Sequence, residues 1–294
     1  MKLLDGKVAS AHIREELKKN ISHNKHKFPR PPHLAAILVG NDGASETYVA
    51  SKIKNCEQIG MQSSLIRFPA DSTQRELEEK IIEINGDPGI DGLIVQLPLP
   101  KHIDETKIIE LINPEKDVDG FHPVNAGKLM LGQKGFVSAT PLGILYLLKY
   151  YDIETAGKNA VIVGRSNIVG RPLSILLSLN KEPGNCTVTL AHSRTKNLRD
   201  VCLTADILVA AIGIPGFITA DMVKEKAVVI DVGITRIDDS SKKSGYSLKG
   251  DVDFENVSNK CSYITPVPGG VGLMTIAALL SNTYNAYLNK FNGN

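Results

Sequence analysis

The sequence has no tryptophan and only four cysteines, Cys56, Cys186, Cys202 and Cys261. Because these cysteines lie far apart in the sequence, they form neither a disulfide framework nor a Cys-x-x-Cys metal pair. We therefore expect four reduced thiols in the core, where free cysteine behaves as a small hydrophobic residue. The sequence predicts no metal site.

Long apolar runs and a strong excess of either charge are also missing. No stretch reaches the roughly eighteen uninterrupted apolar residues of a membrane helix. The first twenty residues are rich in charge and have no apolar core for a secretory signal. The formal net charge is +2, so no strong field attracts the chain to nucleic acid or to a membrane surface. We expect a cytoplasmic protein that binds neither partner.

The 294 residues suffice for a large core, and this length is near the point at which single cores divide into two domains. In the first half, three apolar runs predict buried strands: LAAILVG (34–40), SSLIRFP (63–69) and DGLIVQLPLP (91–100). Between them, Ser45 is expected to cap a helix that reaches Gly60, and TQRELEEKIIEIN (73–85) is a second predicted helix. This alternation predicts an α/β domain with a mostly parallel sheet.

The second half begins with ATPLGILYLLKYYDI (139–153), a predicted connecting helix with Thr140 as its N-cap and Pro141 at its first position. Four apolar, β-branched runs then predict a doubly wound sheet: NAVIVG (159–164), CTVTLAHS (186–193), ADILVAAIG (205–213) and AVVIDVGI (227–234). The last apolar helix, 275–291, is expected to return to the first domain. The predicted fold is α/β with two domains, one of residues 1–139 with 273–294 and a Rossmann-type domain of residues 140–272.

The loop after NAVIVG has features of a phosphate site. Gly164 ends the strand, Arg165 and Ser166 follow, and an apolar helix begins near Pro172. A glycine lets the backbone turn tightly, and a helix N-terminus offers free amides and a positive dipole to phosphate. The pattern differs from Gly-x-Gly-x-x-Gly, because serine holds the second glycine's place and Gly170 comes one residue late. On this loop alone, a dinucleotide site and a plain turn remain equally open.

The end of the next predicted strand favours NADP over NAD. An NAD site usually has an acidic residue at the end of this strand, and that residue binds the ribose hydroxyls. In this sequence the segment CTVTLAHSRT (186–195) has Ser193 and Arg194 near its end instead. A hydroxyl and a guanidinium suit a 2′-phosphate, and Arg165 adds a second planar cation. The simpler interpretation makes both arginines solvated loop residues. Their positions at the carboxyl ends of strands, where such sheets bind ligands, favour the phosphate site.

Tyr48 and Lys52 stand four residues apart in the first predicted helix, so both side-chain ends can reach one ligand. Tyr-x-x-x-Lys is also the active-site signature of short-chain dehydrogenases, so the pair alone indicates two different kinds of enzyme. In a short-chain dehydrogenase the nucleotide glycines precede this pair. Here Gly164 follows Lys52 by more than a hundred residues, which favours a separate substrate-binding domain.

Taken together, the motifs resemble those of the bifunctional methylenetetrahydrofolate dehydrogenase/cyclohydrolases, the FolD-type enzymes of one-carbon metabolism. The resemblance covers nearly the whole chain, and its specificity comes from the order and spacing of many segments. The matching segments are VG (39–40) with Ser45, Tyr48 and Lys52, VQLPLP (95–100), KDVDGF (116–121), TP (140–141), GRS (164–166) with VG (169–170), HSRT (192–195), DVGI (231–234) and PVPGGVG (266–272).

The resemblance implies a folate-binding catalytic domain and an NADP-binding domain, with the folate in a cleft between them. Lys52 matches the catalytic lysine, and Gln96 matches the residue that supports it. Tyr48 matches the residue that stacks on the folate rings, and Asp119 the acid that holds the pterin. The implied substrate-binding residues are Tyr48, Lys52, Val95, Gln96, Leu97, Asp119, Pro268, Gly269 and Gly270, and the implied NADP-binding residues are Gly164, Arg165, Ser166, Ser193, Arg194 and Ile234.

The same resemblance implies two reactions. The chain is expected to oxidise 5,10-methylenetetrahydrofolate to 5,10-methenyltetrahydrofolate with NADP⁺ and to hydrolyse the product to 10-formyltetrahydrofolate. It is also expected to form a homodimer through its nucleotide domain and to serve purine, methionine and histidine biosynthesis.

Two segments depart from the family pattern. Leu273 stands where the glycine-rich loop usually has proline, and Ser138-Ala139 replaces the usual Pro-Cys. Leucine lacks the fixed φ of proline, so this change bears on substrate affinity more than on the type of reaction. The segment NKEPGN (180–185) is longer than the usual turn and is expected to be a surface loop.

Simpler interpretations remain for individual residues. Asp117 and Asp119 suit a tight turn, and Lys52 suits a solvated helix surface. His122 and His192 are left out of the site, because a loop histidine is more often structural. For the whole chain, the alternatives are a noncatalytic NADP-binding module, a monofunctional dehydrogenase and an amino-acid dehydrogenase of similar build. Lys52, Gln96 and Asp119 are evidence against the first, and the lysine is evidence against the second. The VQLPLP and DVDGF motifs are evidence against the third.

Overall fold

The structure is a computed structural model that describes residues 1–242 and 245–292. The chain folds into two compact units. One contains Met1–Ala11 and Thr140–Thr275, and we call it the six-stranded unit. The other contains His12–Ala139 and the residues from Ile276 onward, and we call it the three-stranded unit.

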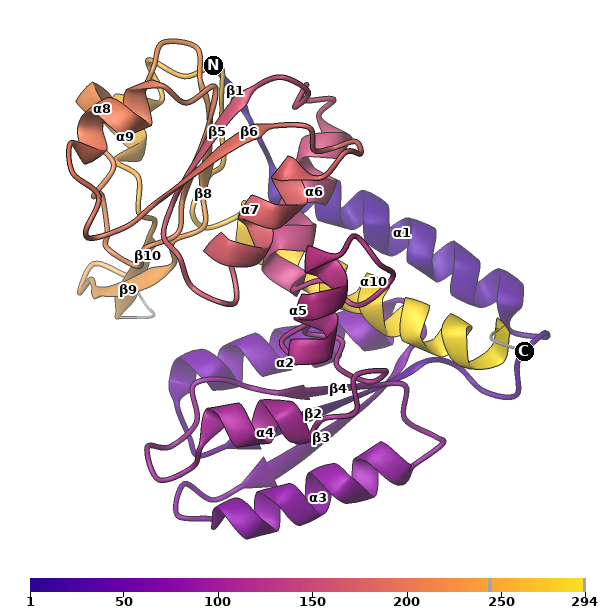
Figure 1. Cartoon of the computed structure of the whole chain (residues 1–294). Coiled ribbons are helices and arrows are strands. Elements are labelled where there is room, and N and C mark those ends of the chain that lie inside the picture. The colour runs from indigo at the N-terminus through magenta and orange to yellow at the C-terminus, as the bar shows by residue number, and fades with distance from the viewer. Residues whose placement is uncertain (243–244, 293–294) are drawn as a thin grey trace. The chain divides into compact units, whose positions relative to one another are not determined.

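The three-stranded unit is built on a parallel sheet with strand order β3-β2-β4. In Figure 1, α2 and α3 lie on opposite faces of this sheet. Both faces of the central strand β2 are therefore covered, and every residue of β2 after His33 is buried. The elements of this unit are β2 (His33–Val39), α2 (Gly43–Gln58), β3 (Gln62–Phe68), α3 (Gln74–Gly86), β4 (Gly92–Val95), α4 (Glu105–Leu111) and α5 (Pro123–Met130), with most of α1 (Gly6–Asn24) and α10 (Val271–Asn292).

Alternation along β2 explains how its two faces are filled. Ala35, Ile37 and Val39 share one face because side chains two apart point the same way. They pack in one cluster with Leu77 and Ile81 of α3. The intervening residues of β2 point to the opposite face, which α2 covers. Burial on both faces explains why this strand is a continuous apolar run.

The six-stranded unit contains a parallel sheet with strand order β1-β11-β8-β7-β5-β6. From β5 the chain goes to β6 on one side and then to β7 on the other side, so the winding direction reverses at β5. In open α/β sheets, ligands bind at such a switch point, outside the carboxyl ends of the strands. The elements are β1 (Lys2–Leu3), α6 (Ala139–Tyr150), β5 (Asn159–Val163), α7 (Gly170–Ser178), β6 (Thr187–Ala191), α8 (Leu198–Leu203), β7 (Ile207–Ala210), η1 (Ala220–Met222), β8 (Val228–Asp231), the hairpin β9 (Thr235–Asp238) and β10 (Tyr246–Lys249), α9 (Phe254–Val257) and β11 (Tyr263–Ile264).

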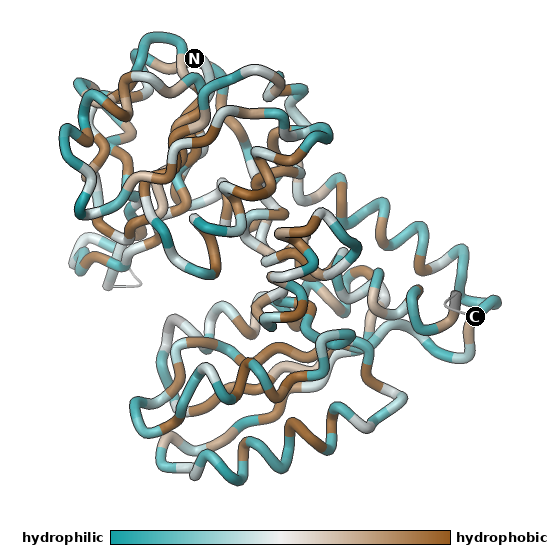
Figure 2. The backbone as a smooth tube through the Cα atoms, in the orientation of Figure 1, coloured by the Kyte–Doolittle hydropathy of each residue, from teal (hydrophilic) through white to brown (hydrophobic). Residues whose placement is uncertain are grey.

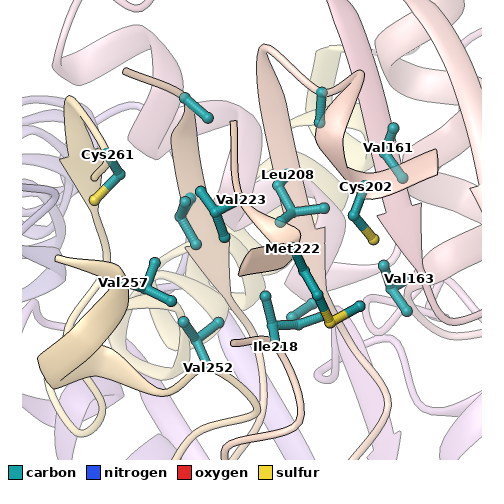
Figure 3. Close-up of a cluster of buried hydrophobic side chains, with 14 of the residues drawn as sticks. Val161, Val163, Cys202, Leu208, Ile218, Met222, Val223, Val252, Val257 and Cys261 are labelled. Carbon is teal, nitrogen blue, oxygen red and sulfur yellow. The ribbon is translucent and has the colours of Figure 1, made fainter. Parts of the chain in front are cut away.

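The core of this unit lies along its sheet, as the hydropathy of the strands shows (Figure 2). Val161, Val163 and Leu208 share one face of the sheet and pack with Cys202 of α8 and Met222 of η1 (Figure 3).

All four cysteines of the chain are buried and free, as expected. In the part of the chain that the structure describes, no helix is long and apolar enough to span a membrane.

Most of the predicted strands and helices are confirmed, with corrections at their ends. Asp42, not Ser45, caps α2: its Oδ2 accepts from the Ser45 amide at 2.8 Å, so Ser45 lies inside the first turn. Helix α6 begins at Ala139, which places Thr140 within the helix. Strand β4 ends at Val95, before the prolines. Helix α7 begins at Gly170 rather than near Pro172.

Helix α10 from Ile276 onward belongs to the three-stranded unit, together with most of the first 139 residues. Tyr287 of α10 donates a hydrogen bond from its hydroxyl to the Arg30 carbonyl at 2.6 Å. The sequence did not predict α1, α4, α5 or the short strands β1 and β11. Strand β1 pairs with β11, which explains why the first eleven residues belong to the six-stranded unit.

Candidate active site

Helix α2 brings Tyr48 and Lys52 together on one face. Its N-terminus is fixed by Asp42, and the spacing of four residues places the two side chains about one turn apart. The Lys52 Nζ atom lies 4.7 Å from the centroid of the Tyr48 ring, within range of a cation–π interaction. Only 4% of the Lys52 side chain is exposed. This burial rules out the interpretation of Lys52 as a solvated residue on the helix surface. A buried lysine almost always has polar partners.

Two polar groups accompany the buried amine. Gln96, the residue after β4, accepts a hydrogen bond from Lys52 Nζ through its Oε1 atom at 3.3 Å. Its Nε2 atom donates to the Leu97 carbonyl at 2.7 Å, which holds the amide so that its oxygen faces the lysine. Asp119 places its Oδ2 atom 3.9 Å from Lys52 Nζ. We call Tyr48, Lys52, Gln96 and Asp119 the Lys52 cluster.

The turn that carries Asp119 is anchored by its neighbour Asp117. Asp117 lies beside Leu93 of β4 in a parallel bridge. Its carboxylate accepts from the amides of Phe121 at 3.1 Å and His122 at 2.8 Å, and from Asn125 Nδ2 at 2.8 Å. The two acids thus differ in role. Asp117 forms the turn, and the Asp119 carboxylate remains near Lys52.

Gly120 and Asn282 complete this anchoring. Gly120 has φ +72°, and a Cβ there would lie 2.5 Å from the Ser138 nitrogen, so no larger residue fits. Asn282 of α10 is buried and donates from Nδ2 to the carbonyls of Val118 at 2.8 Å and Val137 at 2.9 Å. Sequence reasoning missed Asn282. Asn282 stands between Ser281 and Thr283, so nothing in the sequence distinguishes it from the other polar residues of the last helix.

Burial and the ion pair act in opposite directions on Lys52 and Asp119. Burial lowers the pKa of Lys52, and the nearby Asp119 carboxylate partly raises that pKa again. Burial raises the pKa of Asp119, Lys52 opposes this increase, and Asp117 adds to it. One turn after Lys52, burial raises the pKa of Cys56 to about 12, so that group is a neutral thiol. An amine of lowered pKa facing a carboxyl group of raised pKa makes this cluster a candidate functional site.

Glycines shape the carboxyl ends of β5 and β7 in the six-stranded unit. Gly164 has φ +125°, and a Cβ there would lie 2.1 Å from the Ala211 carbonyl oxygen. A Cβ on Gly170 would lie 1.9 Å from the Gly164 carbonyl oxygen. Both positions require glycine, and together they form a tight cradle at the N-terminus of α7. Such an N-terminus suits a phosphate group.

The predicted phosphate-binding side chains lie at this same edge. The Gly164 amide donates to the Ala191 carbonyl at 2.9 Å, so the loops after β5 and β6 start side by side. Arg165 and Ser166 follow β5 and are exposed, and the two residues of the β6 end that the sequence singled out, Ser193 and Arg194, are exposed as well. No acid follows β6 directly.

The remaining predicted site residues fall in two places. Val95 is 5% exposed, and its side chain packs in the core of the three-stranded unit, where Leu97 also packs. Ile234 follows β8 and is 57% exposed. The loop residues Pro268, Gly269 and Gly270 follow β11 and belong to the six-stranded unit. The structure therefore brings the Lys52 cluster together, and it gathers the predicted nucleotide-binding residues at one edge of the other unit.

The Lys52 cluster is equipped for proton transfer in a largely buried setting. It contains one amine of lowered pKa, one carboxylate, one amide and one aromatic face. Among residues 1–242 and 245–292, no group of three or more His, Cys, Asp or Glu side chains is arranged to hold a metal ion.

Comparisons with protein families cover almost the entire chain. Residues 4–119 match the tetrahydrofolate dehydrogenase/cyclohydrolase catalytic domain. Residues 138–291 match the NAD(P)-binding domain of the tetrahydrofolate dehydrogenase/cyclohydrolases. A similar relative is the bifunctional protein FolD of Porphyromonas gingivalis, which is 60% identical over 96% of this chain and 95% of its own length.

Solved structures also match nearly the whole chain. The bifunctional enzyme FolD, a methylenetetrahydrofolate dehydrogenase/cyclohydrolase from Campylobacter jejuni, has a TM-score of 0.92 and 49% identity over 98% of this chain and 99% of its own. The Trypanosoma brucei N5,N10-methylenetetrahydrofolate dehydrogenase-cyclohydrolase, complexed with NADP cofactor and an inhibitor, has a TM-score of 0.93 and 37% identity over 98% of this chain and 97% of its own.

Proposed function

The chain belongs to the tetrahydrofolate dehydrogenase/cyclohydrolase family and is a bifunctional, NADP-dependent enzyme of folate one-carbon metabolism, and we propose that the Lys52 cluster carries its chemistry. The reactions are oxidation of 5,10-methylenetetrahydrofolate to the methenyl form and hydrolysis of that product to 10-formyltetrahydrofolate. The observation that supports the assignment most strongly is a buried lysine held by an amide and a carboxylate.

The oxidation requires little acid–base catalysis from the protein. The methylene carbon lies between two nitrogens, which stabilise the cation left by its oxidation, and bound NADP⁺ supplies the electron acceptor. The residues therefore contribute mainly by orienting the folate. Asp119 can accept two hydrogen bonds from the aminopyrimidine edge of the pterin, and the Tyr48 ring offers a stacking face.

The hydrolysis requires proton transfer, and we assign this task to Lys52. Water adds to the methenyl carbon, and a proton must leave that water as the new C–O bond forms. The bond from this carbon to N5 then breaks and N5 takes up a proton, which leaves the formyl group on N10. Burial lowers the pKa of Lys52, so a larger fraction of its Nζ is neutral near pH 7 than for an exposed lysine. A neutral amine can accept the proton as a general base. Gln96 holds Nζ in place through its Oε1 atom.

For the cofactor, we propose that the α7 N-terminus binds the diphosphate and that Arg165, Ser193 and Arg194 bind the 2′-phosphate. Glycines at 164 and 170 let the end of β5 pack directly against Ala211 and against the start of α7. This close packing holds the α7 N-terminus at the end of β5, and a helix N-terminus suits a phosphate group. The arginines are exposed at the adjacent ends of β5 and β6, where they are available to a ligand.

We also propose that the protein is a cytoplasmic homodimer whose product serves purine, methionine and histidine biosynthesis. Strand β6 is an outer strand of the six-stranded sheet, and residues along it are partly exposed. An outer strand presents unpaired backbone groups, which makes this unit a suitable dimer surface. Light scattering on the purified protein measures the oligomeric state directly, and a monomer at micromolar concentration would refute the dimer.

A spectrophotometric assay with methylenetetrahydrofolate and either NADP⁺ or NAD⁺ tests substrate and cofactor together. We expect NADP⁺-dependent formation of the methenyl product and its subsequent hydrolysis. Reduction of NADP⁺ without hydrolysis would indicate a monofunctional dehydrogenase. Binding of NADP⁺ without either reaction would indicate the noncatalytic module.

A further inference from the structure

Two buried carboxylates lie at the carboxyl ends of β7 and β8, apart from the residues assigned above. Asp231 is the last residue of β8 and is 3% exposed, and Asp251 precedes α9 and is fully buried. Neither has a cationic partner among the ion pairs of the described residues. Buried carboxylates are costly, so the contacts of this pair require an explanation.

Backbone amides surround both groups. Asp231 accepts from the amides of Gly233 at 3.0 Å, Asp251 at 2.8 Å and Val252 at 3.0 Å. Asp251 uses its Oδ2 atom to accept from the amides of Ile212 at 2.7 Å and Gly213 at 3.0 Å. The two carboxylates therefore join the loop after β7 to the loop after β8.

Asp251 occupies a site built closely around it. Its Oδ1 atom is buried and has no hydrogen-bond partner. A Cβ on Gly233 would lie 2.3 Å from the Asp251 Cγ atom, so the carboxylate rests directly on the backbone of the β8 loop. An oxygen left unpaired in this way costs free energy. The two hydrogen bonds that Oδ2 accepts are therefore the interactions that explain why a carboxylate is buried at this position.

The position of these loops connects them to the dinucleotide. The proposed 2′-phosphate site lies at the ends of β5 and β6, on one side of the switch point. Strands β7 and β8 lie on the other side. A dinucleotide bound across the switch point places its adenosine half at β6 and its nicotinamide half at the β7 and β8 ends. Ala211, at the β7 end, already lies against Gly164.

We propose that Asp251 is a positioning residue for the nicotinamide half of NADP⁺, acting through the amides of Ile212 and Gly213. Asp231 supports it by holding the Asp251 amide and the Gly233 amide. This inference rests on the proposed cofactor site. It adds that the nicotinamide end of that site is set by a buried acid that does not touch the ligand.

Calorimetric titration of Asp251→Ala with two ligands tests the proposal. NADP⁺ contains the nicotinamide half, whereas 2′,5′-ADP contains the 2′-phosphate and lacks nicotinamide. We expect Asp251→Ala to weaken NADP⁺ binding about ten- to a hundredfold, because two charge-assisted contacts are lost, and to leave 2′,5′-ADP binding within about twofold. Asp251→Asn, which keeps an acceptor oxygen, should restore most of the NADP⁺ affinity. Asp238→Ala, at an exposed position on β9, is the matched control.

The possible failures are distinguishable. Equal losses for both ligands, or an unchanged NADP⁺ affinity in Asp251→Ala, would overturn the role of Asp251 while leaving the proposed cofactor site intact. A wild-type protein that binds neither ligand would overturn both. If Asp251→Ala does not fold, amide hydrogen exchange of the ligand-free wild type decides. The proposal requires slow exchange at Ile212 and Gly213, and exchange at the rate of an open loop would overturn it.

Discussion

The carboxylate of Asp119 lies 3.9 Å from the ammonium group of Lys52, and each is the principal charged neighbour of the other. Both side chains are largely buried, so neither charge is well solvated. Removing one partner therefore leaves the other in a less favourable environment. The pKa of Lys52 therefore depends on Asp119, which is also the residue proposed to hold the substrate.

Asp119→Asn should move the pH profile of hydrolysis to lower pH. The Asp119 carboxylate raises the pKa of Lys52, so its removal lets burial lower that pKa further. A general base acts when it is deprotonated, and the rise of kcat with pH should then begin at lower pH. The cyclohydrolase kcat at saturating substrate, measured from pH 6 to 10, checks this. Glu57→Gln, at an exposed carboxylate on α2, is the control. A shift to higher pH would contradict the assignment of Lys52 as the base.

Lys52→Met should abolish hydrolysis and spare part of the oxidation. Methionine keeps an apolar stem and removes the ionisable head, and only the hydrolysis requires proton transfer. General acid–base assistance contributes about 10²–10⁴-fold, so a loss of at least that size is expected in the hydrolytic step. The methenyl product should accumulate, which its absorbance reports. Lys54→Met, an exposed lysine on the same helix, should leave both activities unchanged.

Tyr48→Phe should affect hydrolysis less than Lys52→Met does. Phenylalanine keeps the aromatic face that lies 4.7 Å from Nζ and removes only the hydroxyl. A short-chain dehydrogenase would respond in the opposite way, because its phenol transfers the proton. Parallel assays of both activities on the two variants separate these mechanisms. Loss of oxidation in Tyr48→Phe, with intact hydrolysis in Lys52→Met, would restore the short-chain dehydrogenase interpretation.

The sequence predicted the elements whose signals are local. The apolar run of β2 and the helical run of α3 needed only their own periodicity, and both were located within about two residues. The cap of α2 was misplaced because both Asp42 and Ser45 are good N-caps. Only the structure shows which of the two side chains accepts the hydrogen bond.

Contacts between distant segments could not be predicted in the same way. Strand β1 has only two residues and exists because it pairs with β11, more than 250 residues later. Asn282 anchors the Asp119 turn from the last helix, and nothing near either segment indicates this contact. No local signal marks Asp251, since its partners Ile212 and Gly213 lie far away in the sequence. The spacing alone paired Tyr48 with Lys52, and Gln96 and Asp119 joined the candidate site only through the family resemblance. The structure places all four side chains together.

Arg165→Ala and Arg194→Ala should each reduce the preference for NADP⁺ over NAD⁺. A lost charge-assisted contact to the 2′-phosphate costs roughly 1.5–3 kcal/mol, or about ten- to a hundredfold in affinity for NADP⁺, and leaves NAD⁺ binding nearly unchanged. The ratio of kcat/KM for the two cofactors measures the preference. Arg199→Ala, an exposed arginine of the same unit that pairs with Asp221, is the control. An unchanged ratio in both variants would remove this pair from the cofactor site.

The stability of the protein should depend on pH through Asp231. Burial raises the pKa of Asp231 from 3.8 to about 6, more than the surrounding amides lower it. Because the folded state holds the proton more tightly than the unfolded state, the stabilisation is complete below about pH 4 and is lost as the pH rises through 6.

Asp231→Asn cannot ionise, so this loss should disappear in the variant. The amide is expected to lower stability by a constant amount, since its NH₂ group would face the Val252 amide that now donates to Oδ2. The informative quantity is therefore the difference in the free energy of unfolding between wild type and variant. When the pH rises from 4.5 to 7.5, the free energy of unfolding of the wild type should fall by about 2 kcal/mol relative to that of Asp231→Asn. Urea unfolding at the two pH values measures it, with Asp238→Asn at an exposed position as the control. Parallel pH dependences for wild type and Asp231→Asn would show that Asp231 is ionised in the folded protein throughout this range.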